Sequence, residues 1–464
     1  MLPAGRVPPA PTLTRVSAPD LPAPRATVVI VNWNGERWLP GCLDALQRQR
    51  VPYDVAVWVV DNASTDGSLA LLARDYPAVR VLANDANLGF AGGNNTALRE
   101  ITSPFAVLLN NDATPEPDWL AQVLAPFDEP GSDTLAAVTS KVVFAPRFLP
   151  LRLATTLFRP GGGDPRELGV RIASVAVDGE DVTASVLWER LAWRPEGEGA
   201  DRATWTRPSG DLLLPVTGVG PWQVDLRWAA ETAKDVRLSW ETDSITLPVT
   251  AVMTEQHVTV DGATPVDVVN NVGSDVLSAG YGIDRGYQDV DRGQHDAPAD
   301  VFALCGCAVA LRTEAGRAMG WFDDDFFLYY EDTDLSWRLR AAGWTIRYAP
   351  RAVVRHVHSA SSVEWSPTFV FHTDRNRLLM LVKNATAGRA LREVLRYPLT
   401  TGSMAVRELR RAARTRSRPA LRPTWMRLRV LRSFLRLLPV MLGRRAQAGT
   451  VVSRLELEQW LVEP

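Results

Sequence analysis

Three short polar stretches of this 464-residue chain combine residue types that bind metal ions, hold phosphates or accept protons. The first, Asn110-Asn111-Asp112, follows an apolar run, and the second, residues 331–334, reads Glu-Asp-Thr-Asp. The third is His356-Val357-His358. Carboxylate and imidazole groups suit Mn²⁺ or Mg²⁺ when phosphate oxygens and water fill the remaining positions. Together the three stretches fit chemistry with a diphosphate leaving group.

The acidic stretch also has a simpler interpretation as the capped start of a helix. An apolar and basic pattern continues from Asp334 to Gly343, and acids in a first turn offset the free N–H groups there. One acid satisfies that need, whereas three indicate a nearby positive charge or a base that must stay ionised. From this stretch alone, both interpretations remain open.

The composition, 46% hydrophobic and 22% charged, is ordinary for a soluble globular protein of two or three domains. The net charge of −2 hides an uneven distribution. Residues 159–267 contain 18 acidic and 10 basic residues, whereas residues 389–445 contain 16 arginines and only two glutamates. The two segments therefore face different partners.

Cysteine spacing and apolar runs bear on the compartment. Cys42, Cys305 and Cys307 do not show the Cys-x-x-Cys spacing of metal or redox sites, which favours a reduced cytoplasmic setting. We expect Cys305 and Cys307 to lie on one face of a strand. Residues 1–26 are rich in Pro and Ala and predict a disordered arm without a signal peptide. No apolar run is long enough to cross a membrane.

Strand and helix patterns alternate from residue 27 to 144 and would position the first polar stretch. Apolar runs predict strands at 27–33, 54–62, 79–84 and 105–112, and amphipathic runs predict helices at 36–49, 66–76, 92–101 and 117–127. This order is typical of a mainly parallel sheet covered on both faces, which binds ligands beyond the carboxyl ends of its strands.

Polar residues gather at those four strand ends. They are Asn32 and Asn34, then Asp61 and Asn62, then Asn87, and finally residues 110–112. Helix capping would explain one or two of these positions but hardly all four. The sequence therefore predicts one binding site along this edge.

Residues 149–267 alternate polar and apolar residues in short runs, which predicts an inserted antiparallel β-sandwich. Its tryptophans could stack on sugar rings, but core packing is the commoner role. They include Trp188, Trp193, Trp205, Trp222, Trp228 and Trp240. The α/β pattern returns at Val301, and an arginine-rich tail follows residue 385. We expect the tail to be helical but cut by Pro398, Pro419, Pro423 and Pro439.

Two nucleotide motifs are absent. The glycines of "NLGFAGGNN" do not form G-x-G-x-x-G, and no G-x-x-x-x-G-K-[ST] occurs. A dehydrogenase or a P-loop enzyme is therefore excluded as an interpretation.

The chain resembles a family 2 glycosyltransferase of the GT-A fold, in the rhamnosyltransferase-like branch that builds bacterial polysaccharides. The segments that carry the resemblance are "VVIVNWNG", "VVDNASTDGS", "NLGFAGGNN", "LLNNDATP", "FFLYYEDTDLSWRLRAAGW" and "RAVVRHVHSAS". They cover roughly residues 27–145 and 300–385.

With the resemblance, the predicted domain order is as follows: a disordered arm (1–26), the nucleotide-binding half of the GT-A domain (27–148), the inserted β-sandwich (149–267), the acceptor and catalytic half (268–385) and a basic amphipathic helical tail (386–464).

The resemblance implies a role for each site residue. Asp332 matches the general base, and Asp112 and His356 match metal ligands, with His358 as the alternative on the same strand face. The nucleotide-sugar pocket would contain Asn32, Asn34, Asp61, Asn87, Gly89, Asn94, Asn110 and Asn111. The acceptor side would contain Glu331, Asp334, Gly306 and Arg375. Asn110 stands where the family has the first acid of Asp-x-Asp, so Asp112 alone would supply the carboxylate.

The function that the resemblance implies is an inverting, metal-dependent hexosyltransferase that uses Mn²⁺ or Mg²⁺. The best expectation is transfer of rhamnose from dTDP-rhamnose to a glycan or lipid-linked glycan in cell-envelope polysaccharide synthesis. The alternatives are a galactofuranosyl-, galactosyl- or N-acetylglucosaminyltransferase with a UDP-sugar, an inactive carbohydrate-binding protein, or a nucleotidyltransferase. The last would need a basic loop near the first strand.

Two basic segments have open roles. Arg375 and Arg377 on one predicted helix would meet an acceptor phosphate or form a solvated face. The tail suits an anionic membrane surface, and docking on the catalytic domain or on nucleic acid is the alternative. We expect a cytoplasmic protein at the inner face of the plasma membrane, with no nucleic-acid partner.

Overall fold

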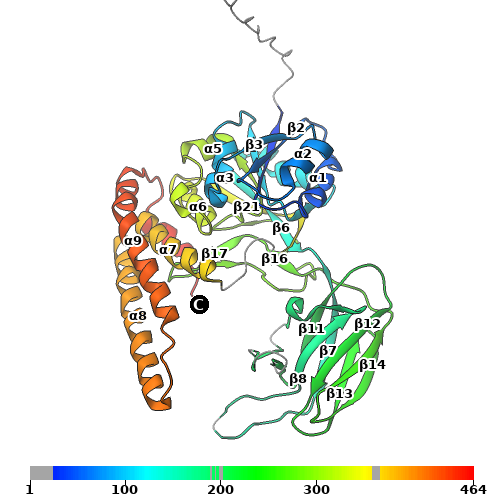
Figure 1. Cartoon of the computed structure of the whole chain (residues 1–464). Coiled ribbons are helices and arrows are strands. Elements are labelled where there is room, and N and C mark those ends of the chain that lie inside the picture. Colours follow the sequence, from blue (N-terminus) through cyan, green and yellow to red (C-terminus); the bar gives the residue numbers. More distant parts are fainter. Residues whose placement is uncertain are drawn as a thin grey trace, which may run out of the picture.

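The computed structural model describes residues 24–162, 164–188, 191–193, 195–197, 202–357 and 366–463. Nearly all of the predicted arm, and His358, lie outside these residues. Figure 1 shows an α/β domain, a β-sandwich beside it and a long helical hairpin at the C-terminal end.

The central sheet has the strand order β19-β21-β6-β20-β4-β1-β2-β3, with β16 paired to β6 and β5 paired to β21. Strands β4, β1, β2 and β3 are parallel, and β20 runs antiparallel between β4 and β6. The strands are β1 (Ala26–Asn32), β2 (Val55–Asp61), β3 (Arg80–Ala83), β4 (Phe105–Leu109), β5 (Ala113–Pro115), β6 (Leu135–Phe144), β16 (Val269–Asn271), β19 (Ala299–Asp300), β20 (Ala308–Arg312) and β21 (Thr345–His356). The predicted mainly parallel sheet is confirmed.

Helices bury both faces of this sheet. They are α1 (Leu39–Gln47), α2 (Ser68–Asp75), α3 (Gly89–Leu98), α4 (Trp119–Leu124), α5 (Thr313–Ala318) and α6 (Glu331–Ala341). Val28 and Ile30 of β1 pack in the same cluster as Leu39 of α1, whereas Val29 packs with Leu335 of α6. Because side chains alternate along a strand, two covered faces require the near-continuous apolar run seen in the sequence.

Two antiparallel sheets form the inserted segment between β6 and β16. One has the order β10-β8-β12-β15 with β9 at its side, and the other is β11-β7-β13-β14. Their strands are β7 (Arg147–Thr155), β8 (Arg171–Val177), β9 (Glu180–Asp181), β10 (Thr204–Trp205), β11 (Ser209–Val216), β12 (Trp222–Ala229), β13 (Lys234–Trp240), β14 (Asp243–Val249) and β15 (Thr254–Val260). Trp222, Trp228 and Trp240 are buried in the shared core, whereas Trp188, Trp193 and Trp205 are partly exposed.

Four helices follow β21: α7 (Pro367–Asn384), α8 (Ala387–Thr415), α9 (Arg422–Gln447) and α10 (Arg454–Leu457). Helix α8 continues through Pro398 and α9 through Pro439, so the expectation that these prolines cut the tail was wrong. Burial of Tyr397 and Phe434 in the cluster that contains α7 offsets the hydrogen bonds lost at the prolines. The break falls at Pro419, and Pro423 lies in the first turn of α9.

The tail therefore packs on the catalytic half, as one of the alternatives expected. Val430, Phe434 and Met441 of α9 are buried beside Leu378 and Leu381 of α7. Among the described residues, no helix combines the length and apolar character that crossing a membrane requires.

A second correction concerns the cysteines. Cys305 and Cys307 flank Gly306 in a turn, and the strand expected from Val301 onward begins only at Ala308. All three thiols are free.

Candidate active site

The ends of β1, β2 and β4 meet through side-chain amides. Asn32 lies opposite Asp61 in the parallel register, and its Nδ2 donates to Asp61 Oδ1 over 3.2 Å. Nδ2 of Asn111 donates to Asn32 Oδ1 over 2.8 Å. Three of the residues predicted for the nucleotide pocket thus form one buried network at the expected edge.

Asn34 shapes the loop that follows β1. Its φ of 51° lies in the left-handed region, which Asn tolerates better than most residues. Its Oδ1 accepts from the backbone N–H of Thr65 at 2.7 Å, and its own N–H donates to Ser64 Oγ at 2.9 Å. Ser64 also receives a hydrogen bond from Asn32. Ser64 therefore joins the β1 and β2 loops, a role that the sequence motif did not assign.

The start of α3 joins the two halves of the α/β domain. Asn87 Oδ1 accepts from the N–H of Gly89 at 2.8 Å, and Gly89 has φ of +71°. A Cβ at Gly89 would lie 2.2 Å from the carbonyl oxygen of Phe327, so only glycine fits. The N–H of Ala91 donates to that same carbonyl at 3.2 Å. The loop before α3, which is predicted to bind the nucleotide, thus contacts the loop before α6.

The adjacent asparagines Asn94 and Asn95 have different roles. Asn94 donates within its own helix, to the carbonyl of Phe90 at 2.9 Å. Asn95 donates to the carbonyl of Phe322 and to Asp324 Oδ1 at 2.8 and 2.6 Å. The sequence predicted no role for Asn95, which holds the loop of residues 322–324 against α3.

Pairing of β5 with β21 brings the second and third stretches of polar residues together. His356 lies opposite Ala113 in this antiparallel pair, and its Nε2 is 3.3 Å from Asp112 Oδ1. Nδ1 of His356 lies 3.0 Å from Asn270 Oδ1, and Asn110 Nδ2 is 3.5 Å from Nε2. The predicted metal ligands Asp112 and His356 are therefore neighbours although 244 positions separate them in the sequence.

The donor set fits a divalent cation. Asn270 Oδ1 can only accept, so the contact at Nδ1 puts the imidazole proton there and leaves an electron pair on Nε2. Asp112 Oδ1 is buried, and a proton on His356 Nε2 would donate to it. Two electron-pair donors facing each other at 3.3 Å need a proton or a cation between them.

Asp332 lies at the start of α6, partly exposed. Its Oδ2 accepts from the N–H of Gly306 at 3.2 Å, and its Oδ1 accepts from the N–H of Thr333 at 2.6 Å. Burial raises the pKa of the Asp332 carboxyl, and the charge of Asp284 adds to the rise, while those hydrogen bonds oppose it. A carboxylate with a raised pKa is a better proton acceptor near neutral pH.

The other two acids of the stretch differ from Asp332. Glu331 is buried, and burial followed by the charges of Asp332 and Asp334 raises its pKa well above the usual value. Asp334 is fully buried and bonds to Lys383, Arg338 and Asn384. Despite burial, those partners lower the pKa of Asp334 to about 2. Asp334 faces α7, and its carboxylate is not available to a bound acceptor.

Helix α7 holds the loop before α6 in place. Asn376 Nδ2 donates to the carbonyls of Phe326, Leu328 and Tyr329, at 2.8, 2.9 and 2.7 Å. Arg375 donates to the carbonyl of Phe326 at 3.0 Å. Phe327, Tyr329 and Tyr330 have φ between 63° and 71°, a strained conformation for aromatic residues.

The solvated face, one of the two expectations for the arginines of α7, was wrong. Arg375 and Arg377 are buried rather than solvated, and their guanidinium groups bond to backbone carbonyls or to Glu393. Arg375 supports the loop before α6, whereas Arg377 bonds to the carbonyl of Ala279 and to Glu393 of α8. A helix periodicity alone does not distinguish a solvated face from one buried against polar groups.

Two further residues of the site carry no sequence motif. Asn270 of β16 fixes the ring of His356, and Asp284 of the β17 (Ser274–Val276) and β18 (Gly282–Asp284) hairpin adds negative charge near Asp332. Asn271 holds Asp284 at 2.6 Å. The pair "NN" at 270–271 after an apolar run resembles the other strand ends and was the available signal.

The two halves of the site meet at the turn around Gly306. The N–H of Asn110 donates to the carbonyl of Cys307 at 2.9 Å, one residue after Gly306, which contacts Asp332. A Cβ at Gly306 would lie 3.1 Å from the ring of Phe90. Close packing at this turn thus fixes the position of Asp332 relative to the Asn110–Asp112 stretch.

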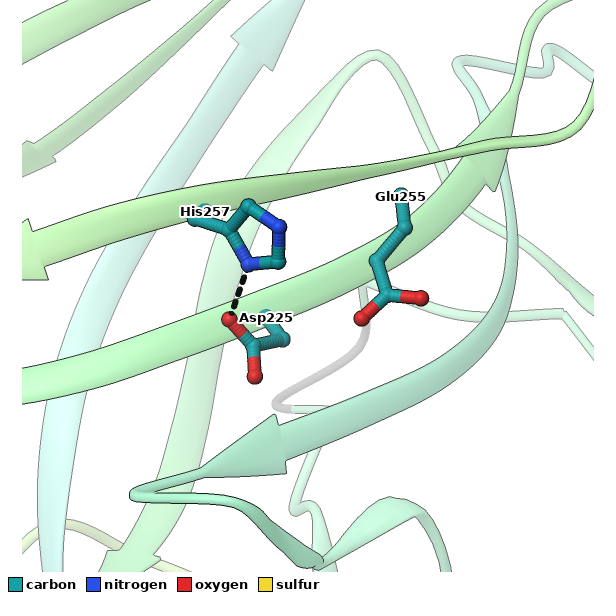
Figure 2. Close-up of side chains that lie close together, drawn as sticks. All are labelled: Asp225, Glu255 and His257. Carbon is teal, nitrogen blue, oxygen red and sulfur yellow. Dashed lines mark hydrogen bonds and ion pairs between the residues drawn. The ribbon is translucent and has the colours of Figure 1, made fainter.

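A separate group of possible ligands lies on the sandwich. Figure 2 shows Asp225 of β12 facing His257 of β15, with Glu255 beside them, and their ligand atoms lie within 4.8 Å of one another. His257 Nδ1 is 2.6 Å from Asp225 Oδ1, which raises the pKa of the histidine. This ion pair accounts for the contact between His257 and Asp225, and the group includes neither Asp112 nor His356.

Comparison with known families agrees with the geometry. The sheet order, the polar strand ends and the acidic helix start define a GT-A-like glycosyltransferase fold. Residues 27–167 match the family described as Glycosyl transferase family 2, and residues 243–377 match Glycosyl transferase family group 2. The resemblance to family 2 glycosyltransferases is thus confirmed over these two segments.

Individual relatives match only segments. The N-acetylglucosaminyl-diphospho-decaprenol L-rhamnosyltransferase of Mycobacterium tuberculosis is 37% identical over 83 residues, 16% of this chain and 27% of that protein. The teichoic acid poly(glycerol phosphate) polymerase of Staphylococcus epidermidis is 32% identical over 92 residues, 19% of this chain and 13% of that protein. The chain thus spans about a quarter or less of the length of these relatives.

Among solved structures, the mannosyltransferase PcManGT from Pyrobaculum calidifontis, in complex with GDP-Man and Mn²⁺, matches with a TM-score of 0.37 and 16% identity. The match covers 92% of this chain and 74% of that one. Likeness at this level carries no argument about ligands.

Proposed function

We propose that the chain is an inverting glycosyltransferase that uses a nucleotide-diphosphate sugar and a divalent cation, Mn²⁺ or Mg²⁺. The observation that carries the proposal is the pair Asp112 and His356, whose Oδ1 and Nε2 atoms lie 3.3 Å apart, linked to Asp332 through the turn at Gly306. A buried carboxylate oxygen beside an imidazole nitrogen is a ligand pair that suits a divalent cation.

In the proposed reaction, Asn32, Asn34, Asp61 and Asn87 line the nucleotide end, with Gly89, Asn94, Asn110 and Asn111 around the diphosphate. Asp112 and His356 would hold the cation, which neutralises charge that develops on the departing diphosphate. Asp332 takes the proton of the acceptor hydroxyl as that oxygen attacks the anomeric carbon from the opposite side. One such displacement inverts the configuration, as in inverting glycoside chemistry.

The loop before α6 controls access to Asp332. Phe326 and Tyr330 are buried, and Phe327 stacks on His372 with ring centroids 5.3 Å apart. Apolar side chains here keep bulk water away from the activated hydroxyl, which favours transfer over hydrolysis. Gly306 holds Asp332 on the acceptor side through its N–H, while Glu331, Asp334 and Arg375 support this side from behind.

For the donor we propose rhamnose from dTDP-rhamnose, with a glycan or lipid-linked glycan as the acceptor, in bacterial cell-envelope polysaccharide synthesis. Support comes from the segment shared with the mycobacterial L-rhamnosyltransferase. Galactofuranose, galactose or N-acetylglucosamine from UDP-sugars are the competing donors. An acceptor on a lipid also accounts for the basic tail if the protein works at the inner face of the plasma membrane.

The test is nucleotide release by the purified chain with Mn²⁺ or Mg²⁺ and a panel of dTDP-, UDP- and GDP-sugars, with lipid-linked acceptors present. We expect turnover with one donor, abolished by EDTA and reduced in Asp112→Ala and Asp332→Asn. An active Asp112→Ala variant that ignores EDTA would remove the cation from the proposal. Sugar binding without turnover of any donor would favour a carbohydrate-binding protein.

A further inference from the structure

Helix α8 exposes an apolar stripe that the catalytic domain does not cover. Leu391, Leu395 and Leu399 are 59%, 54% and 74% exposed, and Val406 and Leu409 continue the stripe. Their spacings of four, four, seven and three residues place all five on one side of a helix with 3.6 residues per turn. The opposite side is anchored by Tyr397 and Glu393, which are buried.

Arginines border this stripe. Helix α8 contains seven arginines and two glutamates, and Arg392 and Arg396 follow Leu391 and Leu395 directly. Their side chains are 60% and 65% exposed. The buried carboxylate of Glu393 is shared by Arg377, Arg392 and Arg396, at 3.5, 3.2 and 3.9 Å. One carboxylate cannot neutralise three guanidinium groups, so positive charge remains beside the stripe.

A cavity of about 570 Å³ opens beside these arginines. Arg389, Arg392 and Arg396 line it together with Tyr281 of the β17–β18 hairpin. The same hairpin ends at Asp284, whose charge acts on Asp332. The basic face of α8 is thus connected to the acceptor side of the candidate site through one short hairpin.

We infer that α8 docks on the surface of an anionic lipid bilayer. The leucines enter the interface between headgroups and acyl chains, and Arg392 and Arg396 contact lipid phosphates. Amphipathic helices with an apolar stripe and flanking basic residues lie in a membrane interface in this way. At 29 residues the helix is about 43 Å long, so it lies along the surface while its buried side stays fixed to the protein.

A second copy of the chain is the competing occupant of the stripe. Two copies that meet along α8 in an isologous contact would bring the arginines of both helices together. Like charges at such a contact oppose association, whereas anionic headgroups neutralise them. The charge pattern therefore favours the lipid surface.

The experiment is co-sedimentation of the full chain with phosphatidylcholine vesicles, with and without phosphatidylglycerol, at low and high salt. We expect binding only to the anionic vesicles and release by salt. Leu395→Gln with Leu399→Gln should weaken binding by about 10-fold or more. Arg392→Gln with Arg396→Gln should weaken it by roughly 30-fold, since each arginine near the surface contributes about 1 kcal/mol.

Matched controls are Val252→Gln and Arg152→Gln, which alter an exposed apolar and an exposed basic residue of the sandwich and should bind as the unmodified chain does. Unchanged binding of the α8 variants, or no binding of the unmodified chain, would overturn the inference. So would a dimer in analytical ultracentrifugation that the leucine variants dissociate. No donor sugar is present, so vesicle binding stands or falls separately from the proposed reaction.

Discussion

Asp332 and Asp334 lie two positions apart in the first turn of α6 but face two different regions of the molecule. Asp332 faces the turn at Gly306 with neutral N–H partners and a raised pKa. Asp334 faces α7 with cationic partners, Lys383 and Arg338, and a lowered pKa. The proposed proton acceptor and the carboxylate that fastens α6 to α7 therefore lie on two sides of a single helical turn.

This difference shows that charge partners, rather than residue type or burial alone, decide what an acid can do. A carboxylate held by cations gives up its proton affinity and stabilises the fold, whereas one with only neutral donors keeps that affinity. The same helix start therefore positions the proposed base and fastens α6 to α7.

The largest expected effect is on the Asp332 side. Asp332→Asn keeps the shape of the side chain but cannot accept the acceptor proton, so turnover should fall by about 10²- to 10⁴-fold. Donor binding, measured by calorimetry, should change little. The exposed Asp133→Asn is the control and should keep full activity. A fully active Asp332→Asn protein would show that Asp332, like Asp334, does not take the acceptor proton.

On the Asp334 side, the change should appear in stability. Lys383→Met removes the cation that contacts both Asp334 and Asp323, at 2.9 and 2.6 Å, and leaves two buried carboxylates with fewer partners. Loss of one partner of a buried pair costs about 3–5 kcal/mol, which urea unfolding would measure. Lys234→Met, on the sandwich, serves as the control. Wild-type stability in Lys383→Met would show that the network is not structural.

The Asp332 side and the Asp334 side should also respond to acid at different pH values. The pKa of Asp334 is lowered, so its stabilisation is complete above the unfolded value near 4 and is lost as pH falls toward 2. The pKa of Asp332 is raised, so activity should decline at a higher pH, while the protein is still folded. Tryptophan fluorescence and the pH profile of kcat/KM would record the two transitions.

The variant Asp284→Asn sharpens this comparison. It removes a negative charge that raises the pKa of Asp332, so the acid limb of kcat/KM should move to lower pH while the acid unfolding transition stays in place. A limb that does not move would mean that a group other than Asp332 controls the profile.

Much of the fold follows from local patterns. Apolar runs of four to nine residues between amphipathic helices determine the parallel sheet, because both of its faces are buried. The carboxyl ends of β1, β2 and β4 were located correctly for the same reason. The continuity of α8 through Pro398 could not be predicted, because it depends on burial of Tyr397 against other elements.

Within the candidate site, the family motifs predicted Asp112, His356 and Asp332 but not their partners. Asn270 and Asp284 reach the site through the pairing of β16 with β6 and through the β17–β18 hairpin. Asn270 and His356 are 86 positions apart in the sequence, and Asp284 and Asp332 are 48 positions apart, so no shared motif links them. The different surroundings of Asp332 and Asp334 could not be predicted either. They depend on Lys383 of α7, which pairs with Asp334, and the sequence periodicity does not specify which side of α7 packs against α6.

The smallest expected effect concerns Glu331, which lies between the two regions. Burial and two neighbouring acids raise its pKa, so ionising it in the folded state costs free energy at neutral pH. Glu331→Gln should therefore raise the free energy of unfolding by about 1–2 kcal/mol at pH 7 and leave it unchanged below pH 4, where the glutamate is protonated in both states. Urea unfolding at the two pH values measures this difference. A loss of turnover without the gain in stability would instead place Glu331 with Asp332, in contact with the acceptor.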